Sequence, residues 1–172
     1  MKNRRAVLTL GALTTISLIA GCAIKPRARA PNDLESKVWH GRLSLRMLAD
    51  ASVGQKQDQS FSAAFELQGS PSQGELQFFT PLGSTAAALH WSPTGAVLRA
   101  RGETRDFNNL AQLITAVLGT DVPVTALFAW LDGQALMVDG WEVDLSDRGQ
   151  GKIQARRSIP APVAELRVLL DD

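Results

Sequence analysis

Short apolar segments separated by turn residues are the feature of this sequence that most limits its possible folds. Alternating apolar and polar positions recur between residues 38 and 101, and clusters of glycine, proline and serine separate them. Parallel strands need long crossover connections, for which these gaps leave no room, so the strands must pair antiparallel. We expect strands at residues 38–48, 60–68, 75–79, 85–91 and 96–101.

The apolar period then changes to that of a helix. Leu110, Leu113, Ile114, Val117 and Leu118 fall at helical spacing. An amphipathic helix is therefore expected, with Asp106 or Asn108 as its cap and Gly119 at its end. A second short helix is expected at residues 123–132, and strands return at 140–145, 152–157 and 163–170. The pattern predicts a mainly β, α+β fold, in which a curved antiparallel sheet carries two inserted helices.

The N-terminus has the pattern of an export signal. Lys2, Arg4 and Arg5 precede an apolar run that ends in the sequence Ile-Ala-Gly before Cys22. The run is shorter than the roughly 20 residues that a helix needs to cross a bilayer. Small residues before a cysteine resemble the lipobox of bacterial lipoproteins, which predicts that Cys22 becomes the lipid-modified first residue. The alternative is that Cys22 is an ordinary cysteine of a secretory signal or a buried thiol.

Three segments follow from this prediction. Residues 1–21 form the lipoprotein signal peptide, residues 22–32 a lipidated N-terminus with a flexible tether, and residues 33–172 the folded domain. The residue after Cys22 is Ala23 and not the aspartate of an inner-membrane retention signal, so the lipoprotein resemblance implies localisation to the outer membrane. Loss of the basic signal leaves a slightly acidic chain with scattered cations, which argues against binding to nucleic acid.

The residues needed for catalysis are scarce. The chain has two histidines, His40 and His90, and its one thiol is assigned to lipid. No metal-binding, phosphate-loop or nucleophile motif is present in the sequence. We therefore expect no enzyme activity, no catalytic residues, no metal site and no cofactor, and we interpret both histidines as structural residues in strands.

An amphipathic lid over a curled sheet would leave an apolar space between the two. The alternative is that the same side chains simply fill an ordinary core, and the sequence does not separate a packed core from a ligand cavity. The candidate cavity residues are Leu43, Leu45, Phe65, Phe78, Leu89, Trp91, Leu113, Ile114, Val117, Leu127 and Trp130.

Several segments resemble one family in the same order along the chain. The segment from Phe79 to Thr85 is the most specific, followed by the helix block at 110–119 and the segments 122–124 and 130–133. Weaker matches lie at residues 39–43 and 140–143. Together they are similar to the LolB family of outer-membrane lipoproteins, which accept other lipoproteins from a soluble carrier.

The resemblance implies a half-barrel with a helical lid and a cavity for acyl chains. It also implies that a LolA-like periplasmic carrier, client lipoproteins and outer-membrane phospholipid are partners of a monomeric protein. The resemblance further implies that Leu82 projects from a loop toward the membrane. Pro81 fixes φ at its own position and Gly83 permits a tight turn, which is compatible with such a loop. The alternative is that Leu82 packs into the core under the turn.

Two alternatives remain open at this point. An outer-membrane assembly or scaffold lipoprotein with a packed core would bind protein surfaces through the same sheet. Family members usually continue into a further strand after residue 170, whereas the printed sequence ends at Asp172. This difference predicts a sheet that is short by one edge, or a divergent relative with a different client.

Overall fold

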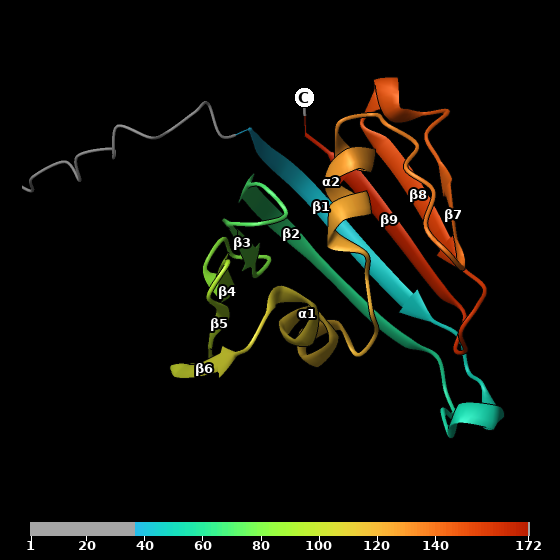
Figure 1. Ribbon diagram of the computed structural model, residues 1–172, viewed down its shortest axis with the longest axis horizontal. Helices are drawn as coiled ribbons and strands as arrows, with labels where there is room; N and C mark the ends of the chain where they lie inside the picture. The colour runs from blue at the N-terminus through green and yellow to red at the C-terminus, as the bar shows by residue number, and fades with distance from the viewer. Residues whose placement is uncertain (1–36, 172) are drawn as a thin grey trace, which may run out of the picture. The chain divides into compact units, whose positions relative to one another are not determined.

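The computed structural model describes residues 37–171, which form one antiparallel sheet and two α-helices (Figure 1). The predicted signal peptide, Cys22 and the tether lie outside these residues. The predicted mainly β fold with a helical cover is confirmed, and the helices are α1 (Leu110–Leu118) and α2 (Val124–Leu131). No helix among residues 37–171 is long and apolar enough to cross a membrane.

The sheet has nine strands in the order β6-β5-β4-β3-β2-β1-β9-β8-β7. Its strands are β1 (Val38–Met47), β2 (Gln59–Gly69), β3 (Gly74–Phe79), β4 (Thr85–Ser92), β5 (Gly95–Ala100), β6 (Glu103–Phe107), β7 (Trp141–Asp144), β8 (Lys152–Arg157) and β9 (Ala164–Leu170). Because β9 lies between β1 and β8, the C-terminal strand is paired on both sides. The edges of the sheet are β6 and β7, so the end of the printed sequence leaves no open edge beside β9.

Two local predictions need correction. The strand β6 was not expected, since four of its five residues are polar or charged and show no apolar alternation. It is an edge strand, and charged side chains are common on edge strands because they discourage pairing with other chains. The cap of α1 is Asn109, whose side chain accepts a hydrogen bond from the backbone N–H of Gln112, whereas Asp106 belongs to β6.

One face of the sheet is apolar, and both helices lie on it (Figure 1). Alternation along β1 buries Leu43, Leu45 and Met47, while the residues between them face outward. Three aromatic contacts join α2 to the sheet. Phe128 packs edge-on against both Trp39 and Trp91, and Trp130 packs against Trp141. Within residues 37–171, the buried apolar residues extend from Leu43 to Val168 and form one cluster.

Candidate functional site

Polar contacts hold the C-terminal end of the helix α2. Arg148 donates from Nε and Nη2 to the backbone oxygen of Leu131, at 3.0 and 2.5 Å. Lys37 pairs with Asp132 at 2.7 Å, and the indole N–H of Trp130 donates to a backbone oxygen beyond the helix. A cation at the C-terminal end of a helix satisfies carbonyl groups that have no partner within the helix. These contacts join the end of α2 to Lys37, which precedes β1, and to Arg148, which lies between β7 and β8.

The helix α1 is held mainly by apolar contacts. Leu113, Ile114 and Leu118 are buried, and Gly119 ends the helix with a positive φ of 74°. The side-chain hydrogen bonds of α1 among residues 37–171 remain within its own N-terminal turn, between Asn108, Asn109 and Gln112. Among residues 37–171, no side-chain hydrogen bond therefore joins α1 to the sheet.

The candidate cavity residues all belong to one hydrophobic cluster. Most are buried, and Leu89 and Leu113 are fully buried, whereas Val117 and Leu127 are half-buried. The structure therefore brings the predicted residues together between sheet and lid, where they pack against one another. This arrangement fits a filled core, and it fits a binding space that opens when the lid moves.

A pocket of about 410 Å³ opens at the side of this cluster, between α1 and the strands β4, β5 and β6. Val117 is the candidate residue that lines it. Its apolar walls also include Ala116 of α1 and Leu98 of β5, and charged side chains of β6 and of the preceding turn complete the lining. The lining of this pocket beside α1 thus combines apolar and charged side chains.

The predicted loop between β3 and β4 presents its leucine to solvent. Leu82 is 95% exposed. The loop is closed by hydrogen bonds from the backbone N–H of Thr80 to the oxygen of Ser84 at 2.8 Å, and from that of Gly83 to the oxygen of Thr80 at 2.9 Å. Gly83 has a φ of 82°, a conformation that glycine adopts without strain. The exposure of Leu82 agrees with the prediction, while contact of this residue with a membrane stays a prediction.

The two histidines lie on strands that β2 and β3 separate. His40 of β1 is 3.5 Å from Glu66, and His90 of β4 is 3.5 Å from Glu75. Both pairs lie on partly exposed side chains. Within residues 37–171 no group of three metal-binding side chains comes together. The histidines therefore do not form a shared site with a carboxylate in a cleft.

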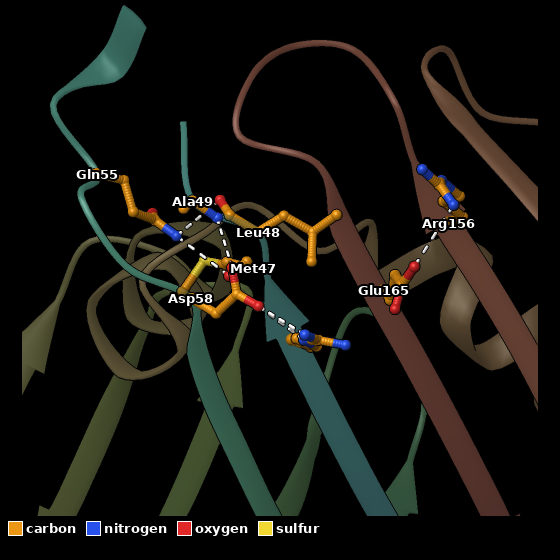
Figure 2. Close-up of polar contacts among 8 residues, drawn as sticks. Met47, Leu48, Ala49, Gln55, Asp58, Arg156 and Glu165 are labelled. Carbon is orange, nitrogen blue, oxygen red and sulfur yellow. Dashed lines mark hydrogen bonds and ion pairs between the residues drawn. The ribbon is translucent and has the colours of Figure 1, made fainter. Parts of the chain in front are cut away.

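Polar contacts fix the hairpin between β1 and β2 (Figure 2). Asp58 accepts a hydrogen bond from the backbone N–H of Ala49 at 2.8 Å, and Nη2 of Arg46 lies 2.6 Å from its other oxygen. The Ala49 N–H, and after it Arg46, hold the pKa of the Asp58 carboxyl below its ordinary value. Gln55 donates to the backbone oxygens of Met47 and Leu48.

A buried arginine of the lid region escaped the sequence analysis. Arg157 is 5% exposed and donates to the backbone oxygens of Asp121 at 3.3 Å and Pro162 at 3.1 Å. It thereby joins the connection between α1 and α2 to the loop between β8 and β9. Burial lowers the pKa of its guanidinium. The strand period does hold a signal, because Arg157 falls on the same face as Ile153 and Ala155.

Comparison with known proteins agrees with this geometry. The family model described as outer membrane lipoprotein LolB matches residues 39–159. A LolB of Shewanella amazonensis is 28% identical over 160 residues, which cover 89% of this chain and 73% of the relative. A LolB of an Azoarcus species is 28% identical over 192 residues, covering 99% of this chain and 97% of the relative. A LolB of Bordetella pertussis is 32% identical over 124 residues, covering 70% of this chain and 59% of the relative. This chain therefore belongs to the LolB family of outer-membrane lipoproteins.

Proposed function

We propose that this protein accepts acylated lipoproteins from a soluble periplasmic carrier and inserts them into the outer membrane. The observation that carries the proposal is the family match over residues 39–159, which includes both helices, the exposed loop and every strand except β9. Cys22 would carry the lipid anchor. Three acyl chains at about 0.8 kcal/mol per buried CH₂ group would make that attachment effectively permanent.

Transfer would depend on differential affinity and would require no chemical reaction. Acyl chains would move from the carrier to this protein, and then to the bilayer, if each host binds them more tightly than the one before. The apolar cluster between sheet and lid offers the binding surface, and the pocket beside α1 offers the entrance. Because α1 is held mainly by apolar contacts, acyl chains could replace those contacts as the helix moves away.

Leu82 would favour delivery on the membrane side. Burying one leucine side chain contributes about 1.5 to 3 kcal/mol. That energy is too small to anchor a protein, yet it is enough to favour the orientation in which the loop contacts the bilayer. The loop itself keeps its hydrogen bonds when Leu82 leaves water, since Leu82 takes part in them through neither side chain nor backbone among the described contacts.

Uptake tests the first step. Residues 23–172, made without lipid, are mixed with the purified carrier loaded with an acylated lipoprotein, and transfer is followed by affinity capture. Ala116→Trp would fill the entrance and reduce uptake, whereas Ala111→Trp, an exposed position of α1 outside the pocket lining, would leave it unchanged. Equal uptake by both variants would contradict the entrance, and no uptake by the native protein would contradict the proposal.

A second candidate function rests on one observation. The candidate cavity residues pack against one another, as the core of an outer-membrane scaffold protein would. A fluorescent fatty acid separates the two functions. Saturable binding to residues 23–172 supports the lipoprotein acceptor, and its absence supports the scaffold.

A further inference from the structure

The hairpin formed by β5 and β6 carries three arginines, Arg99, Arg101 and Arg105. Within residues 37–171, Arg46 and Arg156 pair with carboxylates, whereas Arg42 and Arg167 lie on different strands and take part in no side-chain hydrogen bond or ion pair with another described residue. None of the three hairpin arginines takes part in a side-chain hydrogen bond or ion pair with another described residue. Unpaired cations in one small region are available for an anionic ligand.

The arginines of this hairpin line two pockets that share Ala100, Arg101 and Glu103. Arg101 and Arg105 belong to the pocket of about 410 Å³ beside α1, and Arg99 and Arg101 belong to a second pocket of about 270 Å³. Glu103 lines both pockets as well. The lining of each pocket therefore contains two arginines and one glutamate, and this excess of positive charge favours a ligand with negative charge.

The turn of this hairpin fixes where the cations lie. Arg101 has a φ of 54° and Gly102 a φ of 81°, so the chain reverses within two residues. Arg105 lies opposite Leu98 in the register of the hairpin, and its guanidinium lies 5.3 Å from the ring centre of Phe107. The aromatic ring leaves the planar donor groups of this arginine free to bind an anion.

The hairpin lies next to the loop that exposes Leu82. The strands β3, β4, β5 and β6 are consecutive neighbours in the sheet, so the loop between β3 and β4 and the turn between β5 and β6 lie at the same end of adjacent hairpins (Figure 1). Thr85 and Ala86, which directly follow the Leu82 loop, line the second pocket together with Arg99 and Arg101. An exposed apolar residue and unpaired cations thus share one corner of the sheet.

We infer that the hairpin of β5 and β6 binds the phosphate groups of membrane phospholipids while Leu82 enters the bilayer. Arginine binds phosphate through two parallel N–H donors, and a leucine inserted among acyl chains brings its neighbours to the level of the head groups. The inference rests on the proposed function, and it adds the chemical group that the protein recognises at the membrane surface. Binding of this kind would hold the protein against the membrane with a fixed orientation during delivery.

Vesicle binding tests this inference with residues 23–172, which contain the whole hydrophobic cluster of the described residues. One set of vesicles contains an equal mixture of phosphatidylethanolamine and phosphatidylglycerol, and the other contains digalactosyldiacylglycerol, which has neither phosphate nor charge. The hairpin variant combines Arg99→Gln, Arg101→Gln and Arg105→Gln. The control variant combines Arg42→Gln, Lys152→Gln and Arg167→Gln, which removes the same charge from exposed positions of β1, β8 and β9.

We expect the hairpin variant to lose about fivefold in affinity for phospholipid vesicles per arginine removed, and to lose less at high salt. The control variant should lose much less, and neither variant should change binding to the galactolipid. Equal losses in both variants would mean general charge attraction and would overturn the inference, as would an unchanged hairpin variant. If Leu82→Glu weakens binding to both kinds of vesicle while the hairpin variant does not, the inference fails and the proposed function stands.

Discussion

Replacement of Arg157 by methionine tests the energetics of the lid region. The guanidinium of Arg157 donates two hydrogen bonds to backbone oxygens, at 3.1 and 3.3 Å, and lies 5.9 Å from the ring centre of Trp141. Its Nε is buried without a hydrogen-bond partner among the described residues. Arg157→Met keeps an unbranched apolar chain of comparable length but removes the charge and both donors.

The expected loss follows from opposing contributions. Two long hydrogen bonds from a charged donor contribute about 1 to 1.5 kcal/mol each, and the contact with the indole ring contributes about 0.5 to 1 kcal/mol. Burial of the guanidinium with an unpaired Nε costs about 1 to 2 kcal/mol, and methionine removes that cost. We therefore expect Arg157→Met to lower the free energy of unfolding by about 0.5 to 3 kcal/mol.

Urea unfolding, followed by tryptophan fluorescence at neutral pH, measures this change. The midpoint should fall while the dependence on denaturant stays the same. Arg156→Met is the matched control, because Arg156 is the neighbouring residue on the exposed face and its pair with Glu165 at 3.4 Å contributes at most about 1 kcal/mol. A methionine variant at position 157 that is more stable than the native protein would refute the reasoning, since desolvation would then outweigh the contacts.

Two further predictions concern the frame around the site. The Ala49 N–H and Arg46 lower the pKa of the Asp58 carboxyl in the folded state. The ionised carboxylate therefore stabilises the folded protein at pH values above the pKa of Asp58 in the unfolded chain. This stabilisation is lost as the pH falls through the lowered pKa of the folded state. Asp58→Asn should therefore lower the thermal midpoint at pH 7 and leave it unchanged in strong acid, and an equal effect at both pH values would contradict this. A Cβ at Gly140 would lie 1.8 Å from the backbone oxygen of Ile159, whereas a Cβ at Gly83 would meet nothing within 4 Å. Both glycines have positive φ, so Gly83→Ala should cost about 1 kcal/mol and Gly140→Ala clearly more in urea unfolding, and equal costs would be inconsistent with the close approach.

The sequence predicted most of the fold because periodicity reports burial directly. The strands with clear alternation, such as β1 and β8, and the helix α1 lie within a few residues of the predicted bounds. The edge strand β6 was missed because Glu103, Thr104, Arg105 and Asp106 hide any apolar pattern. Pairing with β5 through the turn at Gly102 determines that strand, and such pairing is tertiary information.

The candidate site was predicted less completely. Periodicity placed Leu89 and Leu113 on buried faces, but it carries no information on whether side chains from sheet and lid leave space between them. The exposure of Leu82 was predicted from the family resemblance, since the residues alone favoured a leucine packed under the turn. Arg157 was missed, because an arginine at the end of a strand is usually exposed, and its hydrogen bonds join segments that are distant in sequence.

The delivery step provides the most direct test of the proposed function. Residues 23–172 loaded with an acylated lipoprotein are mixed with liposomes, and the lipoprotein that sediments with the liposomes is measured for the native protein, for Leu82→Glu and for Val53→Glu. Val53 is 51% exposed in the hairpin between β1 and β2 and serves as the control for a new charge on an exposed apolar residue. We predict that all three take up the lipoprotein, that the native protein and Val53→Glu deliver it, and that Leu82→Glu retains it. Equal delivery by the native protein and Leu82→Glu would contradict the role of the loop, and retention by all three would contradict delivery to the membrane.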